Sequence, residues 1–539
     1  MSETANLRTP VPTAPGNTDA WLERRSDPAA LAVLTVGLAL RIRAASGTFL
    51  NPDEALHYFI ANRGSWSQVY QAGLTMAHPP LLFFVLYLWR QVGTSEFVLR
   101  LPSVFAGTAF CWIFFKWMTA ILGRTPAWIG LIFVTLLPPM VALSAEVRQY
   151  ELLLLFAVSA AYFLEKALAK NSINSLLFSF VCLYLAMLSH YSGFLFAAAL
   201  GIYSLWRVCS RAQSIPLRAT WIAGQMGGVG LGAALYVSHI ARIRGTTMAE
   251  GAFETWLYKS YFHRGQNPLT FALARSFSTF QYLLGQRLIG VLMALAFVAG
   301  IAFLLRGRIL LPKASPTAGQ LVALLILPFA INCGLALLGV YPYGGTRHCV
   351  FLIIFAVAGV AVFLSNLAQE RIVRGIAFAL VVVLCCLAFP STFHPYIRRA
   401  DHSEAHMQKA LAFVREQIPT SAPILVDYET GMLLGYYLCQ RRPISFDESL
   451  PGFLMFQCGG HRIISTGHDL WFLTPQNFRA QCSGPIQTGQ FRPGENIWVG
   501  QAGFNVTLED DLQRESADFH AVQTHAFGKN IRLFSVTVQ

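Results

Sequence analysis

The chain has 539 residues, of which 55% are hydrophobic and only 12% are charged. A soluble domain carries about 25% charged residues, so the composition excludes an ordinary water-soluble protein over most of the length. Lysine and arginine outnumber the acids by 40 to 27, but they stand singly or in pairs between apolar runs. This pattern is typical of membrane topology and argues against nucleic-acid binding.

The apolar runs divide the chain into a polar leader over 1–27, a membrane part over 28–393, and a tail of soluble composition over 394–539. A helix needs roughly 20 apolar residues to cross the hydrocarbon core of a bilayer. We predict about eleven such helices, near 28–46, 99–121, 126–144, 150–168, 173–190, 192–209, 220–239, 285–305, 319–340, 348–366 and 374–393.

The apolar run Pro80–Val92 is too short to span a bilayer, and we predict that it lies on the membrane surface. With this placement, the links that carry basic residues all face the cytoplasm, as the positive-inside rule requires. The N-terminus is then cytoplasmic. The outer side receives a long first loop (about 47–98), a second long loop (about 240–284) and the tail.

The tail is predicted to fold as an α/β domain. We expect helices over 403–418 and 429–438, and strands over 424–427, 462–465, 470–473, 496–500 and 531–538. The tail has three cysteines, and an oxidising outer compartment would allow two of them to pair. We expect the pair Cys458–Cys482, because these residues bracket a short strand-and-helix unit.

Short motifs in the predicted outer loops carry a resemblance to a known family. They are Asn51-Pro52-Asp53-Glu54, Ala77-His78-Pro79-Pro80-Leu81, Leu99-Arg100-Leu101-Pro102-Ser103, Glu146-Val147-Arg148-Gln149-Tyr150, Ser189-His190-Tyr191 and Gly345-Thr346-Arg347. These motifs resemble the GT-C glycosyltransferases of family 39, which include the protein O-mannosyltransferases and the lipid A aminoarabinose transferases.

The resemblance implies a polytopic α-helical membrane protein of the GT-C fold, with the tail as a periplasmic α/β domain. It also implies an inverting glycosyltransferase in the bacterial inner (plasma) membrane. Such an enzyme moves a sugar from a polyprenyl-phosphate-linked donor to an acceptor hydroxyl at the outer face of the membrane.

Asp53 is the only aspartate among the nine acidic residues between positions 28 and 400. Glycosyl transfer from a phosphate to a hydroxyl needs a base that takes the hydroxyl proton, and a carboxylate within reach can serve. We therefore expect Asp53 to be the catalytic base, with Glu54 in support. The competing interpretation is that both acids cap an interfacial helix, because acids favour a helix N-terminus.

A second set of residues is expected to hold the phosphate and sugar of the donor: His78, Arg148, Tyr150, Arg347, His190, Tyr191 and Lys259. The planar guanidinium of arginine suits phosphate, although arginines at helix ends also snorkel to lipid headgroups. His78 stands where the aminoarabinose transferases carry a lysine before proline, so a fixed charge is missing there. The aromatic residues, His190 and Lys259 can equally line a cavity or belong to an interfacial belt.

We expect no cofactor. Adjacent carboxylates can bind a divalent metal, as in the GT-C oligosaccharyltransferases, but the second long loop has no DxD-type pair and the family 39 resemblance implies a metal-independent reaction. The expected partners are a polyprenyl-phosphate sugar donor, a lipid, glycan or protein acceptor, and membrane lipids.

Two other classes of protein compete with a transferase. A transporter or lipid flippase for a glycolipid is also polytopic and basic, but transporters usually have two similar halves with buried acids inside their spans. The sequence has no such halves, and its acids gather near the outer helix ends. A membrane-anchored binding protein whose tail does the work would not need the elaborate first loop.

Overall fold

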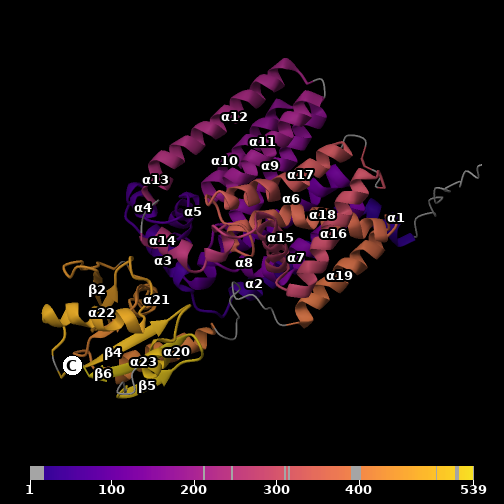
Figure 1. Ribbon diagram of the computed structural model, residues 1–539. Coiled ribbons are helices and arrows are strands. Elements are labelled where there is room, and N and C mark those ends of the chain that lie inside the picture. Colours follow the sequence, from indigo (N-terminus) through magenta and orange to yellow (C-terminus); the bar gives the residue numbers. More distant parts are fainter. Residues whose placement is uncertain are drawn as a thin grey trace, which may run out of the picture.

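The computed structural model describes residues 17–210, 213–243, 247–308, 311–312, 316–389, 402–442, 444–492, 494–515 and 521–537. A large helical body carries a smaller sheet-containing domain at one end (Figure 1). Residues 1–16 of the predicted leader and most of the predicted junction between body and tail, 390–401, lie outside the described residues.

Seven helices in the described ranges are long and apolar enough to cross a membrane. They are α2 (Ser26–Ala45), α6 (Glu96–Leu122), α9 (Tyr150–Lys170), α11 (Ser192–Ser210), α16 (Arg287–Leu305), α17 (Ala318–Leu337) and the continuous segment of η3 (Arg347–Leu352) and α18 (Ile353–Leu367). Three apolar helices are shorter: α7 (Arg124–Leu136), α10 (Ile173–Ser189) and α19 (Ile372–Ala388). With α12 (Ile215–Leu235), every predicted span overlaps a helix, but the count of eleven spans is not confirmed.

Short helices make up the rest of the body. They are α1 (Asn17–Arg24), α3 (Pro52–Ala61), α4 (Trp66–Gly73), α5 (Leu81–Trp89), α8 (Pro138–Leu143), η1 (Tyr236–Ile240), α13 (Ala241–Ile243), α14 (Thr247–Glu254), η2 (Tyr258–Ser260) and α15 (Pro268–Leu284). Helix α5 has nine residues, fewer than half of what a span needs. It packs against α3 and α4. Its predicted place on the membrane surface stays a prediction.

The predicted span over 126–144 is broken into α7 and α8 at Pro138, which has no backbone N–H to donate. The break leaves backbone carbonyls at the end of α7 without helical partners. Arg41 of α2 donates to the carbonyls of Val134 (2.9 Å) and Thr135 (3.0 Å), and to the hydroxyl of Ser144 (3.0 Å). Because an unsatisfied backbone group inside a membrane costs several kcal/mol, Arg41 stabilises this break. The segment after α8, 144–149, contacts α3 through the hydrogen bond that the Val147 amide donates to Glu54.

The tail contains a six-stranded sheet in the order β2-β3-β1-β4-β6-β5. The elements are α20 (Glu404–Gln417), β1 (Ile424–Val426), α21 (Tyr428–Leu438), β2 (Phe453–Cys458), β3 (His461–Thr466), α22 (Pro475–Gln487), β4 (Asn496–Ala502), α23 (Leu508–Glu515), β5 (Gln523–Ala526) and β6 (Ile531–Thr537). Strand β1 pairs in parallel with β3 and β4, and the other pairs are antiparallel. The predicted α/β class is confirmed.

Two details of the predicted tail are wrong. Residues 470–473 form a loop, where the Leu470 carbonyl accepts a hydrogen bond from Thr466, and they do not form a strand. Strands β2 and β5 were not expected from the sequence. Strand β5 lies at the edge of the sheet and is mostly exposed, so its residues lack the apolar pattern that signals a strand.

Helix α21 packs the tail against the segment predicted as the first outer loop (47–98), beside α3 (Figure 1). One hydrophobic core contains buried side chains of the outer loop and of the tail. The hydroxyl of Tyr437 accepts a hydrogen bond from the Leu50 amide (2.7 Å), and the hydroxyl of Tyr436 donates to the Thr94 carbonyl (2.6 Å). The tail and this loop therefore share one hydrophobic core and pack as a single unit.

The disulfide joins Cys439, directly after α21, to Cys458 at the end of β2. The expected pair Cys458–Cys482 is therefore wrong. Cys482 lies on α22 against the hydrophobic core on one face of the sheet, whereas Cys439 and Cys458 belong to the core on the other face. The sheet separates these residues, although they are close in the sequence.

Alkylation of the unreduced, denatured protein should modify eight of the ten cysteines, including Cys482, and spare Cys439 and Cys458. The Cys482→Ser variant should keep this pattern, whereas Cys458→Ser should expose Cys439. In a chain-entropy model a crosslink of this separation stabilises by roughly 3 kcal/mol, so Cys458→Ser should also melt at a lower temperature. A peptide map in which Cys482 is protected would contradict the pairing.

Candidate active site

Asp53 lies in the first turn of α3, where the helix start is already capped by other residues. Asn51 accepts a hydrogen bond from the Glu54 amide (2.9 Å), and the Glu54 carboxylate accepts one from the Asn51 amide (2.8 Å). This capping box satisfies the free N–H groups that a helix start exposes. The interpretation that the acids cap the helix therefore holds for Glu54, whereas the Asp53 carboxylate takes no part in the capping box.

Glu54 is fully buried and forms a two-point ion pair with Arg100 of α6, with both N–O distances at 2.8 Å. The amide of Val147 donates to the same carboxylate (2.8 Å), and Arg100 also donates to carbonyls within 45–49. The pair therefore joins the end of α2, the start of α3 and the segment before α9. Glu54 thus keeps these three segments in place. We assign it a positioning role, in place of the supporting catalytic role expected from the sequence.

The Asp53 carboxylate faces two arginines that are distant in the sequence. Its Oδ2 lies 2.9 Å from Nη1 of Arg148 and 3.6 Å from Nη1 of Arg347. Arg347 in turn lies 3.7 Å from the carboxylate of Glu146. The side chains of Asp53 and Arg347 are 20% and 19% exposed, so both can be reached by a ligand, whereas Glu146 is 3% exposed.

The two carboxyl groups of this cluster differ in pKa. Burial raises the pKa of Asp53, but Arg148, Arg347 and His57 lower it by more, so that it lies below its usual range. Burial raises the pKa of Glu146 to about 7, against a smaller opposing effect of Arg347. Asp53 is therefore ionised at neutral pH, and Glu146 is partly protonated. Pairs of carboxyl groups whose surroundings separate their pKa values are typical of acid–base sites.

Three more of the residues expected to bind the donor, Tyr150, His190 and His78, lie in this cluster. The ring of Tyr150 lies 5.3 Å from that of His190 and 5.5 Å from the guanidinium of Arg148. The ring of His78 lies 5.8 Å from that of His190. The structure thus brings together Asp53, Arg148, Arg347 and three of the residues expected to hold the donor.

Two other expected donor ligands lie elsewhere. The hydroxyl of Tyr191 bonds to Nδ1 of His239 (2.5 Å), and its ring stacks on Phe194. Lys259 is exposed on η2, and none of the ion pairs recorded in the described ranges joins it to Asp53 or Glu146. Neither residue belongs to the cluster around Asp53. The exposed position of Lys259 agrees with the alternative that it belongs to an interfacial belt.

Three residues of the cluster were not proposed from the sequence: Glu146, His57 and His348. Each stands close to a residue that was proposed. His57 follows Asp53 by one helical turn and therefore shares its face of α3. Glu146 precedes Arg148 by two residues and is one of few acids in the membrane part, while His348 follows Arg347 directly. Scanning these neighbours would have found all three.

No group of three or more His, Cys, Asp or Glu side chains in the part of the chain that the structure describes is arranged to hold a metal ion. Asp53 and Glu146, the carboxylates of the cluster, each face a guanidinium. Metal independence itself stays a prediction, which is tested by chelation below.

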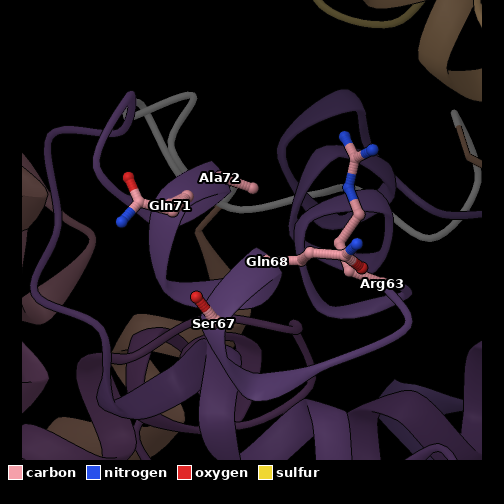
Figure 2. Close-up of a pocket in the computed structure, with 5 residues that line it drawn as sticks. All are labelled: Arg63, Ser67, Gln68, Gln71 and Ala72. Carbon is pink, nitrogen blue, oxygen red and sulfur yellow. The ribbon is translucent and has the colours of Figure 1, made fainter.

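A separate pocket of about 420 Å³ lies on the first outer loop. Figure 2 shows its lining residues at the turn after α3 and along α4: Arg63, Ser67, Gln68, Gln71 and Ala72. None of them belongs to the cluster around Asp53. We therefore place the candidate reaction at Asp53 and not in this pocket.

Comparison with known proteins supports the fold. Residues 77–230 match the model of a family described as dolichyl-phosphate-mannose-protein mannosyltransferase. A comparison with curated proteins gives no match.

Solved structures resemble the whole chain. ArnT from Cupriavidus metallidurans in the apo state is 11% identical with a TM-score of 0.51, and the alignment covers 96% of this chain and 98% of that chain. ArnT from the same organism bound to undecaprenyl phosphate gives the same identity and TM-score, with 94% and 97% covered. The oligosaccharyltransferase of Archaeoglobus fulgidus in complex with Zn and sulfate is 11% identical, with a TM-score of 0.48 and 87% and 67% covered. The ArnT similarity shows a shared fold over nearly the full length of both chains.

Proposed function

We propose that this chain moves a sugar from a polyprenyl-phosphate donor to an acceptor hydroxyl. The premise is that the chain is a multi-pass membrane protein with the fold and family resemblance of the GT-C glycosyltransferases. The observation that carries the proposal is one reachable carboxylate, Asp53, held between Arg148 and Arg347. The ArnT structure with undecaprenyl phosphate supports a donor of this lipid class. We place the reaction, which inverts the anomeric carbon, at the outer face of a bacterial inner membrane.

In the proposed reaction, the Asp53 carboxylate takes the proton of the acceptor hydroxyl. The acceptor oxygen then forms its bond to the anomeric carbon from one face of the sugar. The bond between that carbon and the phosphate oxygen breaks on the other face, and its electron pair stays with the phosphate. Arg148 and Arg347 stabilise the charge that the phosphate gains.

The ion pair between Asp53 and the two arginines gives this mechanism an order of events. The Asp53 carboxylate occupies the position of an anion before donor binds. A donor phosphate that approaches Arg148 and Arg347 competes with the carboxylate and weakens its hold. Asp53 then becomes a stronger base when the donor is present, which limits wasteful reaction with water.

Glu146 is the alternative base in the same reaction. Its pKa of about 7 lies near the operating pH, where a general base is most effective. Its burial and its distance from open solvent argue for the more exposed Asp53. The two assignments differ in pH dependence, because a Glu146 base would lose activity as pH falls through about 7, whereas ionised Asp53 would stay active to lower pH.

The test is transfer by the purified full-length protein in detergent or nanodiscs. It is offered a panel of labelled polyprenyl-phosphate sugars, with an envelope extract of a deletion strain as acceptor. We expect label to move from at least one donor, and to do so in the presence of EDTA. Failure with every donor, at matched folding, would contradict the proposed function, and loss with EDTA that Mn²⁺ or Mg²⁺ restores would contradict metal independence.

Replacing Arg148 with Ala should raise the KM for the donor by roughly 10- to 150-fold, because a hydrogen bond to a charged group contributes about 1.5–3 kcal/mol. The same change removes the nearest positive charge from Asp53 and so raises the pKa of that carboxyl. The acidic limb of the pH–rate profile should therefore move to higher pH. Arg90→Ala, at the C-terminal end of α5 and outside the cluster, serves as the control. An unchanged donor KM in Arg148→Ala would rule out the phosphate clamp.

A further inference from the structure

Four histidine rings form a row along the candidate site, and each comes from a different part of the fold. The ring centres of His57 and His78 lie 6.0 Å apart, those of His78 and His190 5.8 Å, and those of His190 and His348 5.6 Å. His57, His78 and His190 are buried. No group of three or more of these side chains in the described ranges is arranged to hold a metal ion. The spacing between neighbouring rings is one that a water molecule or a substrate oxygen can bridge.

The buried histidines are neutral at neutral pH. Burial, with Arg148 next, lowers the pKa of His57 to about 4. Burial also lowers the pKa values of His78 and His190 well below the usual value, with Arg148 and neighbouring histidines acting in the same direction. The other charged or titratable groups that face the row are Arg347, Asp53, Glu54, Tyr150 and Tyr341.

The hydrogen bonds assign the tautomers of two histidines in the row, His57 and His190. Nδ1 of His57 lies 2.8 Å from the carbonyl of Val147, which can only accept, so Nδ1 carries the proton and Nε2 is a free lone pair. The amide of Ser192 donates to Nδ1 of His190, so the proton of His190 sits on Nε2. The row therefore begins with a free acceptor on His57, and its third member, His190, carries a donor near Arg148 and Tyr150.

Two nitrogen atoms in this row are buried without a partner among the described residues. They are Nε2 of His57 and Nδ1 of His78. Buried polar atoms are nearly always hydrogen-bonded in folded proteins, and an exception calls for an explanation such as a catalytic role. His57 shares a helix face with Asp53, one turn away, and is close enough to act electrostatically on the Asp53 carboxylate.

Each turnover of the proposed reaction leaves a proton on Asp53 and an additional negative charge on the departing phosphate. Asp53 must lose the acceptor's proton before the next turnover. The departing phosphate gains a second charge between two arginines, which would hold it tightly. Moving the proton from Asp53 to the phosphate solves both problems at once, because a phosphate monoester accepts its second proton with a pKa near 6.

We propose that His57 and His78 carry the acceptor's proton from Asp53 to the departing phosphate. The inference rests on the proposed function. The proton passes from the Asp53 carboxyl to Nε2 of His57, and the same Nε2 then releases it to Nδ1 of His78. Nδ1 of His57 keeps its own proton and its bond to the Val147 carbonyl throughout. His78 releases its Nε2 proton to the phosphate oxygen whose bond to the sugar has broken. His190 stays neutral and donates a hydrogen bond through Nε2, so no charge is left on the row.

The decisive variant is His57→Asn, because the Asn side-chain amide can still donate to the Val147 carbonyl but offers nothing at the position of Nε2. We expect kcat to fall by about 10²-fold, at the lower end of general acid–base effects, with the donor KM unchanged. Added imidazole and a rise in pH should each restore part of the loss, because solvent bases then take the proton from Asp53. His78→Gln should show the same loss in kcat, and the double variant should be no slower than either single one, because the two act in series.

The control is His468→Asn, an exposed histidine of the tail, which should behave like the wild type. Melting temperatures of all variants show whether the fold is kept. Wild-type kcat in His57→Asn, additive losses in the double variant, or a change confined to donor KM would overturn the relay. A slow Asp53→Asn with a normal His57→Asn would reject the relay alone. A normal Asp53→Asn would reject Asp53 as the base together with the relay, whereas absence of transfer by the wild type would reject the proposed function.

Discussion

Asp53→Asn should lower the turnover of sugar transfer by about 10²–10⁴-fold, the usual contribution of a general base. This loss corresponds to roughly 3–5 kcal/mol in the activation free energy. Asparagine keeps the size and hydrogen-bonding groups of the side chain but cannot take a proton. The helix start should be unaffected, because Asn51 and Glu54 provide the capping box without Asp53.

The donor KM of Asp53→Asn should stay the same or fall. Asp53 is the anion that occupies Arg148 and Arg347 in the absence of donor, and its removal leaves both cations open to the phosphate. Because Arg148 is 7% exposed, an unpaired charge there should also lower the melting temperature slightly when donor is absent. Added donor should reverse this decrease by binding to the folded state.

Initial rates over a range of donor concentrations separate kcat from KM in this variant. Asp27→Asn is the matched control, since Asp27 is an exposed partner of Lys116 on α2. Turnover near that of the wild type would exclude Asp53 as the base. If Glu146→Gln alone then abolishes transfer, and wild-type activity falls as pH drops through about 7, the base is Glu146.

Arg100→Ala should destabilise the folded protein by about 3–5 kcal/mol, because it leaves the buried carboxylate of Glu54 without its partner. It also removes the donors to the carbonyls at the end of α2. Transfer should fall together with folded protein, because Glu54 also anchors the amide of Val147 next to Arg148.

Thermal unfolding in detergent, followed by size-exclusion chromatography, measures this effect. The matched control is Lys116→Ala, which breaks an exposed ion pair and should change stability by about 0–1 kcal/mol. The double replacement of Arg100 and Glu54 by leucine should recover part of the stability, since an apolar pair avoids the uncompensated charge. An Arg100→Ala protein that melts like the wild type would contradict the structural role of this ion pair.

The sequence by itself determined which segments need lipid and which need water. Apolar length and charge are local properties of the sequence, and they predicted a helix at every proposed span. They also indicated that 81–89 is too short to cross a membrane and that an α/β tail follows the membrane part. The scarcity of acids in the membrane part singled out Asp53. Arg148 and Arg347 were selected from their positions at predicted helix ends and from the family resemblance of the motifs that contain them.

Only the tertiary structure decided which of these side chains meet. Asp53 and Glu54 are neighbours in the sequence, yet one faces Arg148 and Arg347 while the other is sealed by Arg100, because successive residues of a helix point in different directions. The partner of Cys458 was likewise set by the face of the sheet on which each cysteine lies. Arg41 at the broken α7 and the row beginning at His57 depend on contacts across several helices. Such contacts follow from packing over long separations in the chain, which neither composition nor periodicity encodes.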